Sequence, residues 1–439
     1  MSTERLELAD WVIKQAQKNG ADQVAVNISN QRQVDIEFRD KKLETLTEST
    51  QNSLSVDIYS DHKYSSHSTN DLRRDALQRF IEEAVASTKY LARDEYRALP
   101  DPKYYNLNVD IDLKIRDAGY EQIDSSQRVE LAEAIEAAAM AQSDKIISTT
   151  AGYSDVLYHS VKVHSNGFSG QRQGTSFSAG AEVTVKDPNG GRPEDWFWAT
   201  GCFRADLPSA ESLGTQAAQR ALQKIGQEKI ASGLYTMVVE NRAAGRLLGM
   251  LRRPMTARAL QQKSSYLEGM LGKQIASDKL TLVDDPFIEK GLGSRLYDGE
   301  GMVAQKRTFI DRGVLQHYFI DNYYGKKLGM PPTTSSPSNV LFDYGDRDLE
   351  AMIKDVDKGI LITGFIGGNS NSTTGDFSFG VTGILVEKGE LVKPVNEMNI
   401  SGNAKDFWNK LSQAGNDPYL YSSWRIPTLV FEDIDFSGI

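Results

Sequence analysis

Alternating apolar and polar residues, grouped between helical patterns, constrain the fold of this chain more than any other feature. Between residues 6 and 16, apolar side chains recur at every third or fourth position, which is typical of one face of a helix. Four stretches of alternating character follow within residues 22–60, and a second helical stripe covers residues 72–91. We therefore predict a first module over residues 1–98, composed of a helix, an antiparallel sheet and a helix.

The same order of patterns occurs again further along the chain. After a proline-containing linker at residues 100–102, an alanine-rich helical pattern covers 128–142, strand-like stretches follow up to residue 205, and a helical pattern covers 209–225. Runs of strands bounded by helices, without strict alternation of strand and helix, favour antiparallel sheets over a parallel one. We predict a second module of the same kind over residues 105–228, and α+β as the fold class.

The last part of the chain, residues 232–439, is predicted to be a β-rich domain with long loops. Two hairpin patterns end their turns in glycine, at residues 311–313 and 387–389, where a positive φ angle is favoured. Between them lie a helical pattern over 348–357 and a glycine- and serine-rich stretch over 364–380, which we interpret as a loop. The small residues of that stretch would also let its backbone approach an extended peptide.

Charge and cysteine content exclude several classes of function. The 439 residues include 50 Lys and Arg against 60 Asp and Glu, a net charge of −10, which disfavours general binding to nucleic acids or anionic membranes. The single cysteine, Cys202, cannot form an internal disulfide, as is usual in a reducing compartment. The N-terminal residues are too charged for a secretory signal and no apolar stretch is long enough to span a membrane, so we expect a cytoplasmic protein.

Motifs of common catalytic sites are absent from the sequence. It contains no H-E-x-x-H zinc motif, no G-x-S-x-G nucleophile turn, and no G-K-[ST] ending in its glycine-rich stretch. Two of the five histidines, His159 and His164, lie five residues apart in a predicted strand, which places their rings on opposite faces. We therefore interpret the histidines as structural or surface residues.

One segment, residues 241–267, is unusual because it holds six positive charges and no acidic residue. Its positive residues are Arg242, Arg246, Arg252, Arg253, Arg258 and Lys263. Apolar residues at positions 244, 247, 248 and 251 predict an amphipathic helix that ends before Pro254. The segment is either a solvated charged face or, in a chain of negative net charge, a docking surface for a partner or peptide that bears carboxylates.

Longer and more detailed motifs show a family resemblance. The segments K-S-S-Y-L-E-G-M-L-G-K-Q-I, D-G-E-G with the following R-T-F-I-D-R-G-V-L, and G-D-F-S-F-G-V-T-G-I-L-V-E-K-G-E-L-V-K-P-V resemble the TldD/PmbA family, and within it the PmbA (TldE) branch. The resemblance is detailed over residues 232–439, and the family's two N-terminal modules match the order of patterns described above. It implies intracellular proteolysis, because TldD- and TldE-type proteins form a paired metalloprotease that degrades unfolded or peptide substrates. The family also carries the older label of modulator of DNA gyrase.

The zinc ligands of the family are altered in this sequence. TldD-type members carry H-E-x-x-x-H and a cysteine near the C-terminus as metal ligands. The two histidine positions are here Asn241 and Arg246, the glutamate position is Arg242, and no cysteine occurs near the C-terminus. Because arginine has no lone pair to donate and repels a dication, the resemblance implies that this chain binds no zinc and has no catalytic residue of its own.

The resemblance therefore implies a subunit that acts with a partner. We expect a homo- or heterodimer, with a TldD-type metalloprotease subunit supplying the zinc and no cofactor bound by this chain. Five residues are candidates for contact with peptide substrates, namely Arg242, Arg246, Gly367, Gly368 and Asn369.

Two other functions stay open from the sequence alone. The chain is an autonomous metallopeptidase if ligands outside the family pattern, with His159 or His164 as the nearest candidates, hold a metal ion. It is a modulator that binds gyrase or DNA if the positively charged segment at 241–267 contacts them, although the negative net charge disfavours this function. The resemblance is to a family of peptide hydrolases, but because this chain lacks H-E-x-x-x-H and the C-terminal cysteine, we expect it to be inactive alone.

Overall fold

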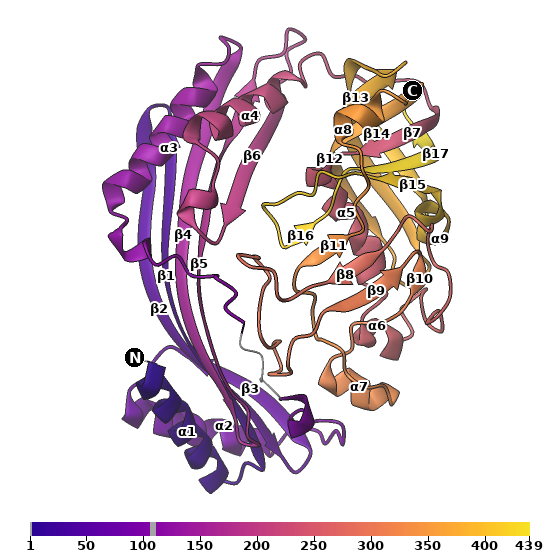
Figure 1. The fold of residues 1–439 in the computed structure, drawn as a ribbon. Coiled ribbons are helices and arrows are strands. Elements are labelled where there is room, and N and C mark those ends of the chain that lie inside the picture. The colour runs from indigo at the N-terminus through magenta and orange to yellow at the C-terminus, as the bar shows by residue number, and fades with distance from the viewer. Residues whose placement is uncertain (1, 106–110) are drawn as a thin grey trace.

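The computed structural model describes residues 2–105 and 111–439, and its combination of helices with mainly antiparallel sheets confirms the predicted α+β class. Met1 and residues 106–110, the latter within the predicted second module, lie outside the described residues. One long sheet with helices on its outer side forms an N-terminal half, and residues 233–439 form a C-terminal half beside its inner face (Figure 1).

The long sheet joins the two predicted modules. In spatial order it contains β3 (Lys63–Thr69), β2 (Lys42–Ser60), β1 (Gln23–Arg39), β4 (Ile146–His164), β5 (Ser169–Val185) and β6 (Glu194–Gly201). Strands β1 and β4 pair antiparallel from Ala25 and His164 to Arg39 and Thr150, so the modules share one sheet instead of having one each. This pairing satisfies the backbone groups of two strand edges that separate sheets would leave open.

The four strand stretches predicted within residues 22–60 are in fact two long strands. Large buried side chains occupy even-numbered positions of β1 from Val24 to Phe38, so one face stays apolar on both sides of a polar middle. No glycine or proline interrupts that middle, and the backbone continues as a single strand. The polar residues at 30–33 mark a change in what covers the strand, not its end.

Two pairs of helices cover the outer face of the sheet. Helices α1 (Ser2–Lys18) and α2 (Arg74–Thr88) pack on one end, and α3 (Ser125–Met140) and α4 (Ala210–Leu222) pack on the other. Both pairs lie on the same face, because Val26 belongs to the first core and Val34, on the same side of β1, belongs to the second. The predicted order of helix, strands and helix is thus confirmed twice.

Among the described residues, no helix has the length and apolar character needed to cross a membrane.

A buried carboxylate, Asp155 of β4, lies between the sheet and α3. Its oxygens accept hydrogen bonds from the hydroxyls of Tyr120 and Tyr153, each at 2.7 Å. They also accept one from Arg128 Nε at 2.6 Å, and the Arg128 and Asp155 side chains are 2% and 0% exposed. These contacts compensate both charges for the loss of water.

The C-terminal half contains two sheets that share one large apolar core. The smaller sheet consists of β10 (Val314–Leu315), β9 (Arg307–Asp311), β8 (Leu282–Asp284), β11 (Val340–Phe342) and β16 (Trp424–Arg425). The larger sheet consists of β14 (Glu390–Asn403), β13 (Asp376–Glu387), β12 (Lys358–Ser370), β7 (Gly233–Val239), β17 (Leu429–Ser437) and β15 (Leu411–Ala414). Strand β14 also pairs with β17, so that β14, β13, β12, β7 and β17 form a closed barrel.

Short helices connect these strands. They are α5 (Asn241–Arg252), α6 (Ala257–Gln261), α7 (Asn322–Leu328), α8 (Leu349–Ile353) and α9 (Ala404–Phe407). Single 3₁₀ turns occur in both halves, at Pro102–Tyr104, Tyr120–Gln122, Arg204–Asp206 and Trp408–Lys410.

Both predicted hairpin turns are confirmed. Arg312 and Gly313 connect β9 to β10 with φ angles of 43° and 78°. Lys388 and Gly389 connect β13 to β14 with φ angles of 52° and 80°. Positive φ at both central positions is the type I′ geometry, whose twist matches that of the paired strands.

The prediction of a loop at residues 364–380 is wrong. Most of these residues belong to β12 and β13, which pair as a hairpin. Glycine is needed because the strands lie close together, and a Cβ atom at Gly380 would lie 2.4 Å from the carbonyl oxygen of Ile366.

The helix predicted at 348–357 is shorter than expected, because α8 ends at Ile353 and β12 begins at Lys358.

The two halves meet along a polar seam between α7 and the residues that follow α2. Asp94 accepts a hydrogen bond from the Tyr323 hydroxyl at 2.5 Å and pairs with Lys327 Nζ at 3.0 Å. The side-chain amide of Asn322 donates to the Ala98 carbonyl at 2.8 Å. These contacts hold the lower part of the long sheet against the C-terminal half (Figure 1).

Glu300 lies beside this seam and is held in a partly desolvated position. It accepts a hydrogen bond from the Asn322 backbone N–H at 2.9 Å. Burial raises the pKa of Glu300 to about 7, and the charges of Asp298 and Asp321 act in the same direction. The Asn322 N–H and the charge of Lys162 lower this pKa without cancelling the effect of burial.

A Glu300→Gln variant is expected to gain stability relative to the wild type as the pH rises. The folded protein holds the Glu300 proton up to a pKa of about 7, whereas the ordinary value is 4.5, so the carboxyl destabilises the fold increasingly between these values. Glutamine has no proton to lose, and the difference in unfolding free energy should reach about 1–3 kcal/mol above neutral pH. Urea unfolding of both proteins at acidic and alkaline pH measures it, and a difference independent of pH contradicts the prediction.

Candidate functional site

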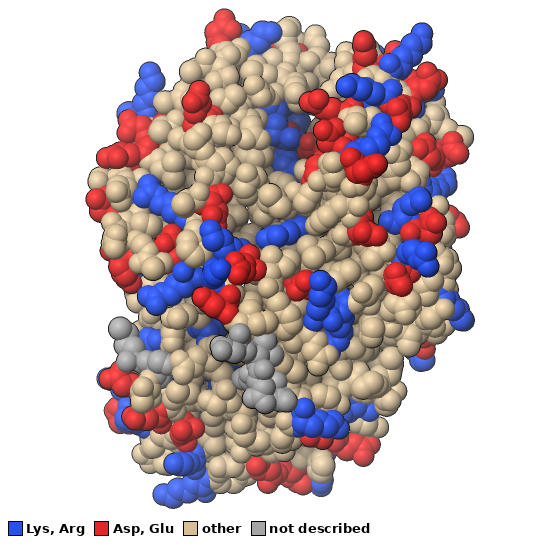
Figure 2. Space-filling model, in the orientation of Figure 1, with Lys and Arg blue, Asp and Glu red and all other residues tan. Residues whose placement is uncertain are grey.

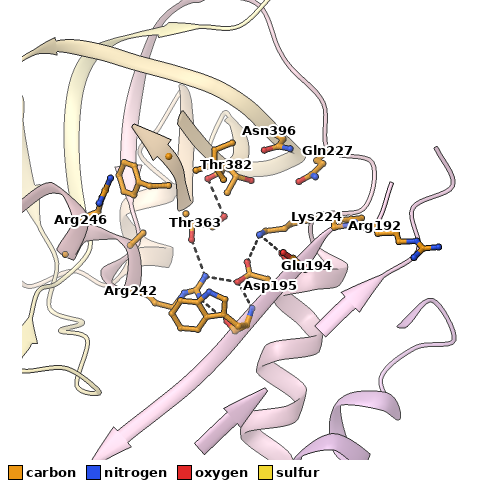
Figure 3. A pocket seen from close by; sticks show the side chains of 18 residues that line it. Arg192, Glu194, Asp195, Lys224, Gln227, Arg242, Arg246, Thr363, Thr382 and Asn396 are labelled. Carbon is orange, nitrogen blue, oxygen red and sulfur yellow. Dashed lines mark hydrogen bonds and ion pairs between the residues drawn. The ribbon is translucent and has the colours of Figure 1, made fainter. Parts of the chain in front are cut away.

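The positively charged segment forms α5, which follows β7 directly and directs its first turn towards the N-terminal half (Figure 3). The predicted apolar stripe is buried in the large core, and the helix ends at Arg252, ahead of Pro254. Because the stripe is turned inwards, the polar face of the helix lines the space between the halves.

A cavity of about 980 Å³ lies in that space, beside the first turns of α5 (Figure 3). The N-terminal half lines it with Arg192, Pro193, Glu194, Asp195, Trp196, Lys224 and Gln227. The C-terminal half lines it with Arg242, Ala243, Gly245, Arg246, residues 363–367, Thr382 and Asn396. Lys and Arg side chains are visible inside the hollow between the halves in the upper part of Figure 2. The volume is within the usual range of ligand sites.

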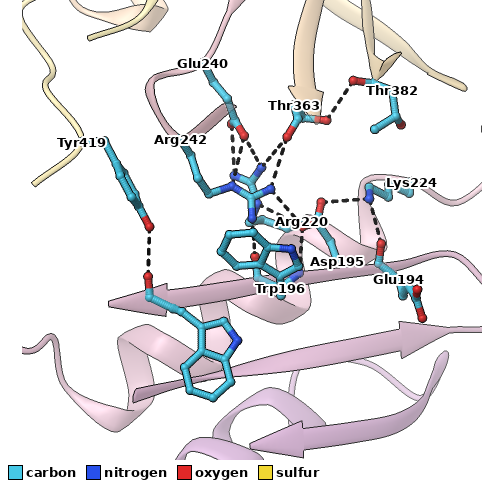
Figure 4. A network of polar contacts seen from close by, with 11 residues as sticks. Glu194, Asp195, Trp196, Arg220, Lys224, Glu240, Arg242, Thr363, Thr382 and Tyr419 are labelled. Atoms are coloured by element: carbon cyan, nitrogen blue, oxygen red, sulfur yellow. Dashed lines mark hydrogen bonds and ion pairs between the residues drawn. The ribbon is translucent and has the colours of Figure 1, made fainter. Parts of the chain in front are cut away.

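Arg242 is fixed in the cavity wall by two acidic residues (Figure 4). Its Nη2 atom lies 3.0 Å from Asp195 Oδ1, and its Nε atom lies 3.3 Å from Glu240 Oε1. The guanidinium lies 4.2 Å from the centre of the Trp196 ring, and Nη1 donates to the Trp196 carbonyl at 2.8 Å. The Arg242 side chain is 7% exposed, so its charge is compensated within the chain.

Arg220 of α4 and the nearby Lys224 complete this network. Arg220 pairs with Glu240 and its Nε atom lies 3.6 Å from Asp195, while Lys224 Nζ lies 3.1 Å from Asp195. Burial raises the pKa of Asp195, but the surrounding cations outweigh burial and hold this pKa below its usual value. Because Asp195 belongs to β6 and Glu240 follows β7, the network joins the two halves.

Arg246 lies one turn further along α5 and is more exposed. Its Nη2 atom donates to the Gly368 carbonyl at 2.9 Å, and its guanidinium carbon lies 5.2 Å from the centre of the Phe379 ring. In the described part of the chain, Arg246 has no ion-pair partner. Its charge is therefore available to a ligand in the cavity.

The structure brings most of the predicted contact residues to this region. Arg242, Arg246 and Gly367 line the cavity, and Gly368 supplies the carbonyl that holds Arg246. Gly367 and Gly368 have φ angles of 72° and 85° at a bulge of β12, a conformation that favours glycine. Asn369 pairs with Ser378 of β13 and is not part of the lining. Contact of these residues with a peptide stays a prediction.

Sequence reasoning did not identify the residues of the N-terminal half that line the cavity. Asp195 and Trp196 belong to β6, whose alternation predicted a strand but not what the strand faces. Asp195 and Arg242 are separated by 47 positions, so no local spacing connects them. One signal was present: a cluster of positive residues without an acid, in an acidic chain, indicates that distant carboxylates compensate part of it.

The first turn of α5 does not fit a zinc ion. Asn241 donates its side-chain amide to the Asp417 carbonyl at 2.7 Å, and the guanidinium groups of Arg242 and Arg246 have no lone pair for a metal. Across residues 2–105 and 111–439, no group of three or more His, Cys, Asp or Glu side chains is arranged to hold a metal ion.

His159 and His164 lie on opposite faces of β4, as their spacing predicted. His159 Nδ1 lies 2.7 Å from Arg5 Nη1 of α1, on the face covered by helices. His164 Nδ1 lies 3.0 Å from the Tyr105 hydroxyl on the inner face. Burial, with a contribution from Lys162, lowers the pKa of His164 to about 3, so this ring is neutral. Neither histidine lines the cavity beside α5.

The chain matches all three domains of one family of peptidases. The PmbA/TldA metallopeptidase domain 1 matches residues 24–88, the central domain matches 119–225, and the C-terminal domain matches 232–438. Metalloprotease PmbA of Escherichia coli O157:H7 is 28% identical over 423 residues, which cover 95% of this chain and 93% of the relative.

Solved structures are similar along their whole length. A crystal structure of a candidate modulator of DNA gyrase from Bacteroides thetaiotaomicron is 42% identical, covers 99% of each chain and has a TM-score of 0.97. TldE from Thermococcus kodakarensis, at 19% identity, has a TM-score of 0.86 over 98% of this chain and 100% of that one, and thus shows the same fold. The three matched domains and the relative with 42% identity show that the chain belongs to the TldD/PmbA family.

Proposed function

We propose that this protein is a non-catalytic, PmbA/TldE-like subunit that pairs with a TldD-type metalloprotease to degrade unfolded peptides. The observation that carries the proposal is the position of Asn241, Arg242 and Arg246. These residues stand where the resemblance places zinc ligands, and the two arginines line the cavity of about 980 Å³ between the halves. The peptide would enter this cavity, and the TldD-type partner would supply the zinc and the hydrolytic step.

The contacts of the altered residues support a subunit that functions without its own zinc. Arg242 is buried in ion pairs that join the two halves, and Asn241 is hydrogen-bonded to the Asp417 carbonyl. Neighbouring groups thus neutralise the charge of Arg242 and satisfy the side-chain amide of Asn241. Such mutually consistent contacts are expected where these side chains form a stable part of the cavity wall. Zinc ligands at the same positions would remove these contacts.

The cavity offers groups suited to a peptide. Gln227 and Asn396 line it with their amides, together with Thr363 and Thr382, whose hydroxyls donate to the Thr382 and Val395 carbonyls. Neutral donors and acceptors of this kind can bind a peptide backbone without selecting a particular sequence. Arg246 adds a positive charge, so we expect a preference for peptides with carboxylates near the bound segment.

The two other functions have less support. The candidate ligands of an autonomous metallopeptidase, His159 and His164, face opposite sides of β4 and contact different residues. A modulator that binds DNA would use the segment 241–267, but Arg242 is already paired with acids and the chain has a net charge of −10. Stoichiometric zinc with peptidase activity sensitive to chelators would favour the first function, and DNA affinity that falls with salt would favour the second.

Mixing the protein with a TldD-type subunit from the same organism tests the proposal. We expect a complex on size-exclusion chromatography and digestion of an unfolded peptide that a chelator abolishes. This protein alone is expected to digest nothing. If the TldD-type subunit digests the peptide equally well alone, and no complex elutes, the subunit role is wrong.

Within that complex, an Arg246→Ala variant is expected to raise the KM for an acidic peptide about tenfold, because a charge-assisted hydrogen bond contributes roughly 1.5 kcal/mol. Arg253 provides a matched control, since it belongs to the same segment but does not line the cavity. Arg253→Ala should leave KM within about twofold of the wild type. Digestion of a fluorogenic peptide measures both values, and equal effects would remove Arg246 from the peptide site.

A further inference from the structure

A second, smaller cavity of about 160 Å³ lies at the seam between the halves, away from α5. Its floor includes Ala25 of β1, which pairs with Asp57 of β2 on one side and His164 of β4 on the other. Because Ala25 is much smaller than these neighbours, the inner face of the sheet has a hollow there. The C-terminal half covers the hollow with Gly299, Glu300, Asn322 and Tyr323.

Two cations face this cavity without an ion-pair partner in the described part of the chain. The guanidinium carbon of Arg97 lies 3.6 Å from the centre of the Tyr323 ring and 4.5 Å from that of Tyr64. Stacking between rings fixes the plane of a guanidinium and leaves its N–H edge free for a planar anion. Lys162 of β4 reaches across the seam and donates to the Gly299 carbonyl.

Two carboxylates line the same cavity. Glu300 accepts a hydrogen bond from the Asn322 N–H at 2.9 Å, and Asp57 accepts one from the Tyr64 hydroxyl at 3.1 Å. Among the described residues neither carboxylate forms an ion pair, although Arg97 and Lys162 line the same space. Charges that are partly removed from water destabilise a protein unless they are compensated. Burial raises the pKa of Glu300 to about 7, and a ligand with both charges would compensate the two cations and Asp57 while its positive group favours the ionised form of Glu300.

We propose that this cavity binds a small α-amino acid. The carboxylate of the ligand faces Arg97 and Lys162, and its ammonium group faces Glu300 and Asp57. A cavity of about 150 Å³ holds a molecule the size of benzene, so glycine, alanine and serine fit whereas aromatic amino acids do not. The site is separate from the cavity beside α5, and because both halves supply its walls, the bound amino acid holds them together.

Isothermal titration calorimetry of the full chain with glycine and L-alanine tests this proposal. Both are expected to bind, whereas acetate and methylammonium, which carry one charge each, should bind at least about tenfold more weakly. L-Phenylalanine is expected to give no heat, because it exceeds the volume of the cavity. Acetate binding as tightly as glycine, or no heat from glycine and alanine at millimolar concentrations, overturns the proposal.

Two variants locate the binding in this cavity. Arg97→Gln should weaken glycine binding at least about tenfold, because it removes the cation expected to bind the carboxylate. Ala25→Leu should abolish binding by filling the floor, and circular dichroism shows whether each variant is folded. Arg93→Gln is the matched control, since Arg93 pairs with Asp61 on the exposed surface at 2.8 Å. Wild-type affinity in folded Arg97→Gln, or an equal loss in Arg93→Gln, overturns the assignment.

Discussion

An Asp155→Ala variant is expected to lose about 3–5 kcal/mol of unfolding free energy. The substitution leaves the guanidinium of Arg128 charged and 2% exposed, without the carboxylate that compensates it. It also removes the acceptor of the Tyr120 and Tyr153 hydroxyls, both of which lie 2.7 Å from an Asp155 oxygen. Three buried donors therefore lose their partner at one position between α3 and the sheet.

Urea unfolding followed by circular dichroism measures this loss. Glu48→Ala is a matched control, because Glu48 pairs with Arg32 at 2.8 Å on the same sheet while the two side chains are 44% and 30% exposed. Exposed ion pairs contribute about 0–1 kcal/mol, so the control should remain close to the wild type. Equal losses in the two variants would show that burial does not determine the contribution of the Asp155 cluster.

An Arg242→Ala variant is expected to lose about 2–4 kcal/mol and to loosen the contact between the halves. Asp195 and Glu240, which are 5% and 9% exposed, would each lose one of their cations. Arg220 and Lys224 would then compensate both carboxylates, so the expected loss is smaller than for Asp155. Trp196 would also lose the guanidinium stacked on its ring.

Hydrogen exchange distinguishes a local opening from general destabilisation. We expect faster exchange in β6 and in the first turn of α5 of Arg242→Ala, and unchanged exchange in the core of α1 and α2. Arg246→Ala is the control from the same helix; because Arg246 is exposed and has no ion pair among the described residues, its loss should stay below about 1 kcal/mol. Similar exchange in both variants would mean that Arg242 does not join the halves.

The helices were predictable because their signals are local, whereas the shared sheet was not. An apolar stripe depends on residues three or four positions apart, but the pairing of Ala25 with His164 joins distant parts of the chain. The glycine-rich stretch was misinterpreted because glycine serves both loops and crowded strands. Gly380, packed against the Ile366 carbonyl, belongs to the second case.

The local charge pattern of the sequence did not distinguish two arginines of the site that have different surroundings in the folded protein. Arg242 and Arg246 occupy one charged helix and look equivalent in the sequence. Two carboxylates compensate Arg242, and one of them, Asp195, comes from the other half of the molecule. The resemblance located the altered zinc positions, but the cavity that they line depends on how β6 and α5 meet, which no spacing in the sequence records.

The unbroken length of β1 and β4 has a mechanical consequence. At about 3.3 Å per residue, the 17 residues of β1 extend for roughly 55 Å. Bending such a strand in the middle would break ladder hydrogen bonds to both of its neighbours, so the sheet behaves as a stiff beam. The covalent connection between the halves, residues 223–232, follows α4 at the β6 end of the sheet, where Lys224 Nζ lies 3.1 Å from Asp195. A rotation of the sheet about this connection would therefore move β6 little and would displace the Ala25 end, at the opposite end of β1, the most.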